Sequence, residues 1–371
     1  MRVTIISRTY ILRFNRDKWR YVPAEIGLHL ITPPHVRHIL QTYTVQVSER
    51  WPHTIVPGYW TQRMSGFCFS PRGLFAALRC ARPDLVQVDE EPASLALLQV
   101  LALKFIFGYR VIFFTWENLA SARSVLGRLN TFIALRWADG AIAGNTGAMH
   151  LLQRMGFKKP IAIIPQLGVN EEIFKPSRNV ALRRALGLNA FTIGYAGRLV
   201  AEKGLLHLVE ALTRLSSPWQ WLVVGNGSLK EEIQKTAQLY GISDRIRWVS
   251  TVEHEAVADY LNAMDVLVLP FVSTPRWKEQ FGHVLIEAMA CEVPVIGSDS
   301  GAIPEVIGDD GLIFPEGDVE ALADRLRTLQ QNEGLRVELG RRGRARVLEK
   351  YTNRHVAAQT VDFWLKVCPC A

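Results

Sequence analysis

The stretch Glu279-Gln-Phe-Gly-His-Val-Leu-Ile-Glu287 places two carboxylates eight positions apart across the junction of a loop and a helix. Gly282 relaxes the backbone at the turn, and the apolar residues that follow predict a helix over 283–290. The free N–H groups and the positive dipole end of that helix face the turn, so an anionic group can bind there. The stretch therefore predicts a site for a phosphorylated ligand.

Glu287 lies among aliphatic residues of the expected helix, where a buried carboxylate is costly unless it accepts hydrogen bonds. Sugar hydroxyls are suitable donors. At about 1.5 Å per residue, Glu287 lies on the order of 10 Å along the helix axis from the turn, which leaves room for a ribose there and a hexose beside Glu279. The alternative is a solvated Glu279 and a Glu287 paired with a core arginine, and this stretch alone favours neither.

A second segment, Gly194-Tyr-Ala-Gly-Arg-Leu-Val-Ala-Glu-Lys-Gly204, follows an apolar strand candidate and precedes a helix expected over 205–215. It sets two cations, Arg198 and Lys203, in a glycine-flanked loop between strand and helix. Guanidinium and ammonium groups near a helix N-terminus suit a diphosphate. The competing interpretation is a surface loop with ordinary charges.

Together the two segments resemble the family-4 glycosyltransferases of the GT-B fold, also called glycosyl transferases group 1, which are retaining enzymes that use nucleotide sugars. Further segments continue the resemblance in the family's order and spacing, and it is strong from about residue 137 to 330 and looser before. These segments are Ile163-Ile-Pro-Gln-Leu-Gly-Val-Asn-Glu-Glu-Ile-Phe174, Asp265-Val-Leu-Val-Leu-Pro270, Pro294-Val-Ile-Gly-Ser-Asp-Ser-Gly-Ala-Ile-Pro-Glu305 and Gly311-Leu-Ile-Phe-Pro315.

The resemblance implies an α/β protein with two doubly wound, Rossmann-like domains that face each other across a cleft. Strand and helix candidates alternate along the chain, which independently predicts two parallel sheets with helices on both faces. The strand candidates cover 3–7, 27–32, 85–88, 111–115, 140–144 and 161–165, then 192–196, 219–224, 246–250, 266–269, 293–297 and 311–314. The expected parts are an acceptor-binding domain (1–175), a linker (176–189), a nucleotide-sugar-binding domain (190–350) and a last helical segment (351–371) that crosses back to the first domain.

The resemblance also assigns roles to residues of the second domain. Arg198 and Lys203 would stabilise the departing diphosphate, and Glu279 would hold hydroxyls of the transferred hexose, so these three are the expected catalytic residues. The donor nucleotide sugar would contact Gly197, Gly225, Gly227, Val252, Phe281, Gly282, His283, Val284 and Glu287, the last through ribose hydroxyls. No metal and no further cofactor are expected, since cations do this work and the sequence has no Asp-any-Asp motif.

Departures from the family pattern lie in the first domain. The segment Ser7-Arg-Thr-Tyr-Ile-Leu12 lacks the paired glycines that many members place after the first strand. Where many members have a histidine, the chain has Thr115-Trp-Glu-Asn118. Trp116 and Glu117 are therefore expected on the acceptor side, with Glu117 either replacing that histidine or capping the next helix. The acidic run 89–91 either approaches the acceptor as well or is solvated.

Composition is that of an ordinary globular protein of two domains, with 371 residues, 49% hydrophobic and 21% charged. Cysteine usage indicates a reducing compartment, because five cysteines form no even framework. They are Cys68, Cys80, Cys291, Cys368 and Cys370. A cytoplasmic protein is expected, and a zinc site at the Cys368-Pro-Cys370 end is disfavoured because too little chain surrounds it.

Positive charge is concentrated in the first half of the chain. Residues 1–185 carry 24 Lys plus Arg and 11 Asp plus Glu, a net charge of +13, whereas residues 186–371 carry 19 and 24, a net charge of −5. The basic, aromatic stretch 13–21, followed by His35, Arg37 and His38, suits anionic lipid headgroups or an acidic acceptor, and a solvated helix face is the alternative. Nucleic acid is not an expected partner, because no recognition motif accompanies the charge.

The segment 95–116 is apolar apart from Gln99, Lys104 and Arg110, which argue against a membrane span. We expect a helix over 93–107 and a buried parallel strand over 111–115. A second ambiguous motif, Val223-Val-Gly-Asn-Gly-Ser228, begins like a dinucleotide-binding fingerprint. It is incomplete, since Lys230 takes the third glycine position. By resemblance, Gly225 and Gly227 let a base or ribose come close.

These observations predict a retaining hexosyltransferase that uses a UDP- or GDP-linked sugar. Its expected acceptor is a glycan or a lipid-linked precursor of cell-envelope polysaccharide, handled in the cytoplasm at the inner face of the membrane. The alternatives are a sugar-nucleotide epimerase or a glycosyl phosphorylase on the same fold, or a catalytically silent nucleotide-sugar-binding protein.

Overall fold

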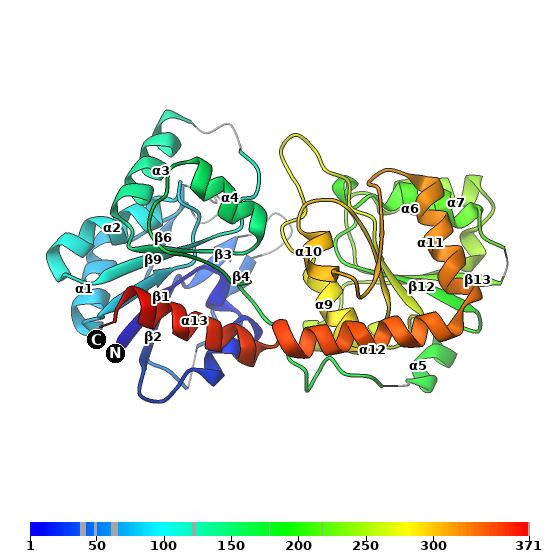
Figure 1. Cartoon of the computed structure of the whole chain (residues 1–371), viewed down its shortest axis with the longest axis horizontal. Coiled ribbons are helices and arrows are strands. Elements are labelled where there is room, and N and C mark those ends of the chain that lie inside the picture. Colours follow the sequence, from blue (N-terminus) through cyan, green and yellow to red (C-terminus); the bar gives the residue numbers. More distant parts are fainter. Residues whose placement is uncertain are drawn as a thin grey trace. The chain divides into compact units, whose positions relative to one another are not determined.

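The computed structural model describes residues 1–37, 42–47, 50–60, 66–120, 124–177, 179–216 and 218–369 (Figure 1). The chain divides into two compact units, one of residues 1–168 with 353–371 and the other of residues 169–352. His38 and Cys370, which the sequence analysis singled out, lie outside the described residues.

The first unit is built on a parallel sheet of seven strands in the order β11-β10-β9-β8-β1-β2-β5. Its strands are β1 (Arg2–Ile6), β2 (Gly27–Thr32), β5 (His53–Ile55), β8 (Leu85–Val88), β9 (Arg110–Thr115), β10 (Gly140–Ala143) and β11 (Ile161–Ile163). Two short antiparallel pairs lie beside it: β3 (His35–Arg37) with β4 (Thr42–Thr44), and β6 (Gly58–Tyr59) with β7 (Cys68–Phe69). Because β8 follows β1 on one side and β2 lies on the other, the strand order reverses between β1 and β8.

One face of this sheet is covered by α1 (Pro71–Ala81), α2 (Leu95–Phe107) and α3 (Val125–Trp137), whose buried side chains share one core. The helix α4 (Thr146–Arg154) follows β10. The other face is covered by two short 3-10 helices, η1 (Thr9–Ile11) and η2 (Phe14–Tyr21), and by the last helix of the chain, α13 (Asn353–Val367). The apolar segment near residue 100 thus forms α2 and β9, as expected. None of the helices described combines the length and apolar character needed to cross a bilayer.

The basic stretch near the N-terminus forms η2 and is only partly solvated: Arg16, Lys18 and Trp19 are buried, whereas Arg13, Phe14 and Arg20 are exposed. Contact of this stretch with anionic lipid or an acidic acceptor stays a prediction. The ring of Trp19 stacks on that of Trp364 from α13, with centroids 5.6 Å apart and an interplanar angle of 19°. Lys18 lies 4.2 Å from the Trp19 ring centroid, and burial lowers the pKa of its ammonium to about 8. Aromatic packing against α13 buries Trp19 and, with it, Arg16 and Lys18.

The second unit has a parallel sheet of six strands in the order β14-β13-β12-β15-β16-β17. Its strands are β12 (Phe191–Ala196), β13 (Trp219–Val224), β14 (Ile246–Val249), β15 (Val266–Leu269), β16 (Val295–Ser298) and β17 (Leu312–Phe314). In register, Gly194 of β12 pairs with Leu222 of β13 and with Leu267 of β15. The order is that of a doubly wound dinucleotide-binding fold, with its reversal between β12 and β15.

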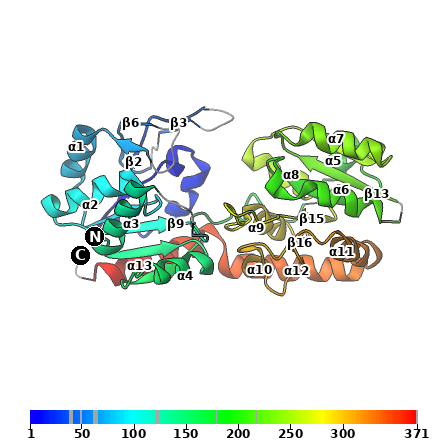
Figure 2. The ribbon, with the colours of Figure 1, turned by 90° about the horizontal axis from the view of Figure 1, so that it is seen from above.

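Helices lie on both faces of this second sheet, as Figure 2 shows for α6 and α9. They are α5 (Val180–Ala185), α6 (Leu205–Thr213), α7 (Lys230–Leu239), α8 (Val257–Leu261), α9 (His283–Ala290), α10 (Ile303–Ile307), α11 (Val319–Gln331) and α12 (Glu333–Lys350). Three 3-10 turns accompany them: η3 (Ala201–Lys203), η4 (Ser243–Arg245) and η5 (His254–Ala256).

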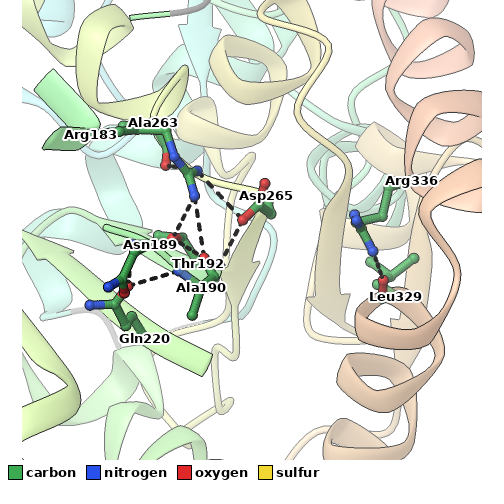
Figure 3. A network of polar contacts seen from close by, with 9 residues as sticks. All are labelled: Arg183, Asn189, Ala190, Thr192, Gln220, Ala263, Asp265, Leu329 and Arg336. Carbon is green, nitrogen blue, oxygen red and sulfur yellow. Dashed lines mark hydrogen bonds and ion pairs between the residues drawn. The ribbon is translucent and has the colours of Figure 1, made fainter. Parts of the chain in front are cut away.

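The segment 176–189, expected to be a linker, lies within the second unit and contains α5. Figure 3 shows how it is held: Arg183 donates to the carbonyl of Ala263 (2.8 Å) and pairs with Asp265, which also accepts from the N–H of Thr192 (2.7 Å). These polar contacts fix the starts of β12 and β15, at the amino edge of the sheet.

Candidate active site

The site in the second unit follows from the strand order. The chain leaves β12 and β15 at the same carboxyl edge, side by side, where the sheet order reverses. Connections from two such strands run to opposite faces of the sheet, and the space between them is where ligands bind in this class of fold. The two connections are residues 197–204, with Arg198 and Lys203, and residues 270–282, with Glu279.

Lys203 and Glu279 meet across this point. The Nζ of Lys203 lies 2.6 Å from Oε2 of Glu279, and it also lies 4.9 Å from the ring centroid of the buried Phe271. Glu279 is only 8% exposed, so the alternative of a solvated carboxylate is wrong. A charge-assisted bond in such a partly desolvated place holds both loops in one arrangement.

The backbone fixes Glu279 as well. Its Oε1 accepts from the N–H of Gln280 (3.1 Å), and its carbonyl accepts from the N–H of Ala302 (3.0 Å), which precedes α10. The carboxylate is thus held by Lys203 and by the N–H of Gln280, while the main chain of Glu279 is held by Ala302, so the carboxylate is preorganised. Such preorganisation lowers the cost of binding hydroxyl groups.

Arg198 is exposed and lies beside the same cluster. The hydroxyl of buried Tyr195 donates to the carbonyl of Arg198 (2.6 Å), which holds the loop against β12. Burial raises the pKa of Tyr195, the negative charge of Glu279 raises it further, and the positive charge of Arg198 opposes the shift. Tyr195 is therefore close to both charges, which puts Arg198 near the Lys203–Glu279 pair. The catalytic roles of these three residues stay a prediction.

Glu287 lies on α9 and is 6% exposed. Its Oε1 lies 2.8 Å from Nε2 of His254 in η5, and the His254 ring packs edge-on against Phe174, with centroids 5.3 Å apart. The partner is thus a histidine and not the core arginine weighed as an alternative. His254 is not among the residues predicted for the site, although a histidine two residues after Val252, in the loop that follows β14, was a usable signal.

The helix α9 begins at His283, as predicted, and Gly282 precedes it with φ of +77° and no side-chain cap. A left-handed φ is favourable for glycine and strained for other residues. The first N–H groups of the helix thus have no side-chain oxygen at the N-cap position to accept from them. Phe281 is buried, with its ring edge-on to Tyr351 at 5.7 Å, so its ring belongs to the core.

The glycines after β12 and β13 serve the packing of two loops against each other. A Cβ on Gly225, whose φ is +137°, would lie 2.0 Å from the carbonyl oxygen of Gly197, and one on Gly227 would lie 2.2 Å from that of Leu199. Gly197 donates to the carbonyl of Val224 (2.9 Å). Glycine is therefore required here by the neighbouring backbone, a reason distinct from the expected approach of a base. Val252 is half-buried after β14, at the same sheet edge.

The first unit places a second group of polar side chains at its own sheet reversal. Glu90, after β8, forms two bonds of 2.6 Å with Arg8, after β1. The neighbouring Asp89 accepts from the hydroxyl of Tyr10 (2.5 Å). Both carboxylates are buried, so a solvated role for this pair is wrong.

Glu91 is tied to the end of β9, where the family's histidine is missing. It accepts from the hydroxyl of Thr115 and from the N–H of Trp116 (2.9 Å). Burial raises the pKa of the Glu91 carboxyl to about 7; the charges of Glu117 and Glu90 add to the shift, and the two hydrogen bonds oppose it.

Glu117 donates its N–H to the hydroxyl of Thr115 (3.1 Å), and Trp116 donates its ring N–H to Gln166 (3.2 Å). The next helix, α3, is capped by Ser124, whose hydroxyl accepts from the N–H of Gly127 (3.1 Å). Glu117 therefore does not cap it, and that alternative is wrong.

Comparison with known proteins agrees with this geometry. Residues 181–346 match the family model described as glycosyl transferases group 1. An alpha-maltose-1-phosphate synthase of Mycolicibacterium smegmatis is 31% identical over 52% of this chain and 52% of its own length. The capsular polysaccharide biosynthesis glycosyltransferase CapM of Staphylococcus aureus is 33% identical over 44% of this chain and 43% of its own. The chain thus spans about half the length of these relatives.

A likeness over the whole chain comes from a solved structure. The Anabaena protein Alr3699/HepE, solved in complex with UDP, has a TM-score of 0.79 over 99% of this chain and all of its own, with 16% sequence identity. At that identity the likeness concerns the fold, which is GT-B. The segment that forms most of the second unit thus matches the glycosyl transferases group 1 family.

Proposed function

We propose that the chain is a retaining glycosyltransferase that moves a hexosyl unit from a UDP- or GDP-linked sugar to an acceptor hydroxyl. The observation that carries the proposal is the largely buried Lys203–Glu279 pair at the strand reversal, with exposed Arg198 near it. Two cations and a fixed carboxylate at one point suit a diphosphate joined to a sugar, since the cations match the phosphates and the carboxylate matches hydroxyls.

In this proposal the ribose hydroxyls donate to Glu287, and the diphosphate lies among Arg198, Lys203 and the start of α9 at Gly282, His283 and Val284. Lys203 then shares its protons between Glu279 and a phosphate oxygen. Negative charge grows on the diphosphate as the bond to the anomeric carbon breaks, so the two cations bind the transition state more tightly than the ground state.

Retention of configuration is proposed to follow from attack on the face that the diphosphate leaves, with the acceptor proton passing to a departing phosphate oxygen. The side-chain cations supply the charge stabilisation for which a divalent ion would otherwise be needed, so we propose transfer that needs no metal and no additional cofactor.

The acceptor is proposed to be a glycan or a lipid-linked precursor of a cell-envelope polysaccharide, bound in the first unit. Support comes from the polar edge formed by Glu91, Trp116 and Glu117, whose carboxylates suit sugar hydroxyls. The likeness to CapM, named for capsular polysaccharide biosynthesis, is consistent with this class. We propose that the reaction occurs in the cytoplasm, with no role for nucleic acid.

Calorimetric titration with UDP and GDP tests the donor half of the proposal and identifies the base. Turnover of labelled nucleotide sugars with cell-envelope extract tests the whole, and NMR of the product gives the anomeric configuration. Epimerisation of the donor without any acceptor, or a requirement for inorganic phosphate, would assign the site to an epimerase or a phosphorylase. Binding of both nucleotides without transfer from any donor would leave a silent binding protein. Activity abolished by EDTA and restored by a divalent ion would contradict the metal-independent step.

A further inference from the structure

The helix α3 turns polar side chains inward and apolar side chains outward, the reverse of an ordinary surface helix. The side chains that it turns into the first unit include Asn130 and Thr131, which are 3% and 5% exposed. Asn130 donates to the carbonyl of Ala93 (3.1 Å), and Thr131 donates to that of Gly127 (2.8 Å). The outward side carries Val125, Leu126, Leu129 and Phe132, of which Val125 is 75% and Phe132 67% exposed.

The neighbouring helix α2 extends this apolar surface. Its last turn exposes Phe105 and Ile106, each to 66%. The ring of Phe105 packs edge-on against Trp137 at the end of α3, with centroids 5.0 Å apart, so the two helices lie side by side (Figure 1 and Figure 2). Contiguous exposed apolar side chains on two packed helices indicate a surface that is covered in use.

The charged side chains of α1, α2 and α3 are all basic. The three helices α1, α2 and α3 contain no Asp or Glu. Their basic side chains are Arg72, Arg79, Lys104, Arg128 and Arg136. Lys104 pairs with Asp139 (2.7 Å), whereas the four arginines are exposed and have no ion pair among the residues described.

We propose that the outer face of α1, α2 and α3 docks on an anionic lipid bilayer, with the apolar side chains of α3 and the end of α2 inserted between headgroups. Apolar insertion combined with arginines at the rim is the pattern of an interfacial membrane contact. A second copy of the chain is the disfavoured occupant, because a two-fold contact sets the same arginines against each other.

The placement of α3 connects this face with the acceptor edge. Its centre lies beside the start of α2, through Asn130 and Ala93, and its end lies beside the end of α2, through Trp137 and Phe105. The turns with Val125 and Leu126 therefore extend past the start of α2, at the sheet edge where Glu91 and Trp116 meet. This step rests on the proposed function: an acceptor carried in a bilayer would be presented to that edge.

Flotation of the full chain with lipid vesicles tests the docking surface. We expect binding to vesicles of equal parts phosphatidylcholine and phosphatidylglycerol, weaker binding to phosphatidylcholine alone, and loss of binding at high salt. The double variant Leu129→Gln with Phe132→Gln should bind the vesicles at least about tenfold more weakly, since two inserted side chains are lost. The matched control is Leu239→Gln on α7, whose side chain is 83% exposed in the other unit and should change nothing.

A double variant that floats like the unchanged protein would overturn the proposal. So would light scattering that finds a dimer which the same double variant dissociates, because the face would then belong to a second copy. UDP binding by calorimetry separates the two proposals. If the double variant loses vesicle binding and keeps UDP binding, both stand; if vesicles bind as expected but neither UDP nor GDP does, only the donor proposal fails.

Discussion

The Nζ of Lys203 and Oε2 of Glu279 lie 2.6 Å apart, although 76 residues separate them in the chain. The pair links the connection after β12 to the connection after β15, so the two halves of the doubly wound sheet are joined by an ion pair at their reversal point. A phosphate that approached Lys203 would compete with the Glu279 carboxylate for the ammonium group. A hydroxyl that approached Glu279 would donate to a carboxylate that Lys203 already holds in place.

Replacing Lys203 by alanine should abolish transfer and lower the stability of the second unit by about 3–5 kcal/mol, because Glu279 would remain buried without its cation. Differential scanning calorimetry and turnover measure the two effects. The double variant Lys203→Met with Glu279→Gln removes both charges and should recover much of the stability without recovering activity. If the single variant kept its turnover, the role of Lys203 at the diphosphate would be disproved.

The His254–Glu287 bond should set the affinity for the ribose. His254→Ala leaves the Glu287 carboxylate without its donor, and we expect UDP to bind about tenfold more weakly. His254→Gln retains an N–H donor and should bind nearly as the unchanged protein does. The loss should shrink with 2′,3′-dideoxy-UDP, which lacks the hydroxyls proposed to contact Glu287. An equal loss for both nucleotides would show that His254 acts elsewhere than through the ribose.

Glu91 should make stability depend on pH. Its pKa is raised by burial from 4.5 to about 7, so the folded state holds a proton that the unfolded state releases. The stabilisation is complete below the unfolded pKa, falls as the pH rises from about 4.5 to about 7, and is lost above it. Thermal unfolding across this window should show a falling midpoint that Glu91→Gln flattens. The exposed Glu172→Gln serves as the control and should leave the slope unchanged.

Trp364 should be essential to the first unit and unimportant to the second. It stacks on Trp19, and its ring N–H donates to Gln87 (2.7 Å), so Trp364→Ala removes a buried ring and leaves the Gln87 oxygen without its partner. A loss of about 3–5 kcal/mol is expected for unfolding of the first unit. Limited proteolysis, read by mass spectrometry, should show cuts in residues 1–168 and protection of 169–352. Equal cutting of both units would contradict this division.

Much of the fold could be predicted because buried parallel strands are continuous apolar runs. Those of β2, β8, β13 and β15 were predicted with the bounds that the structure has, and α9 likewise. Motif spacing also led to Arg198, Lys203 and Glu279, because the carboxyl ends of neighbouring parallel strands bring their loops together. The short edge strand β5 was missed, since three residues that include His53 carry no apolar pattern.

What sequence could not show depends on long-range packing. The burial of Lys18 follows from a tryptophan of α13 that lies more than three hundred positions away. The partner of Glu287 is a histidine on a loop that only the sheet brings close. The outward apolar side of α3 escaped notice because Asn130 and Thr131 bond to nearby carbonyls, which satisfies polar groups in the interior that a sequence pattern assigns to solvent.

The return of the chain's last helix to the first unit has a consequence for biosynthesis. Residues 1–168 emerge from the ribosome long before α13 is synthesised. The aromatic surface around Tyr10 and Trp19 is therefore not covered by α13 while the second unit is translated. The N-terminal unit is thus begun first and finished last. Expression of that unit alone should yield an aggregating product, and a chaperone that shields this surface during translation should raise the yield of the complete chain.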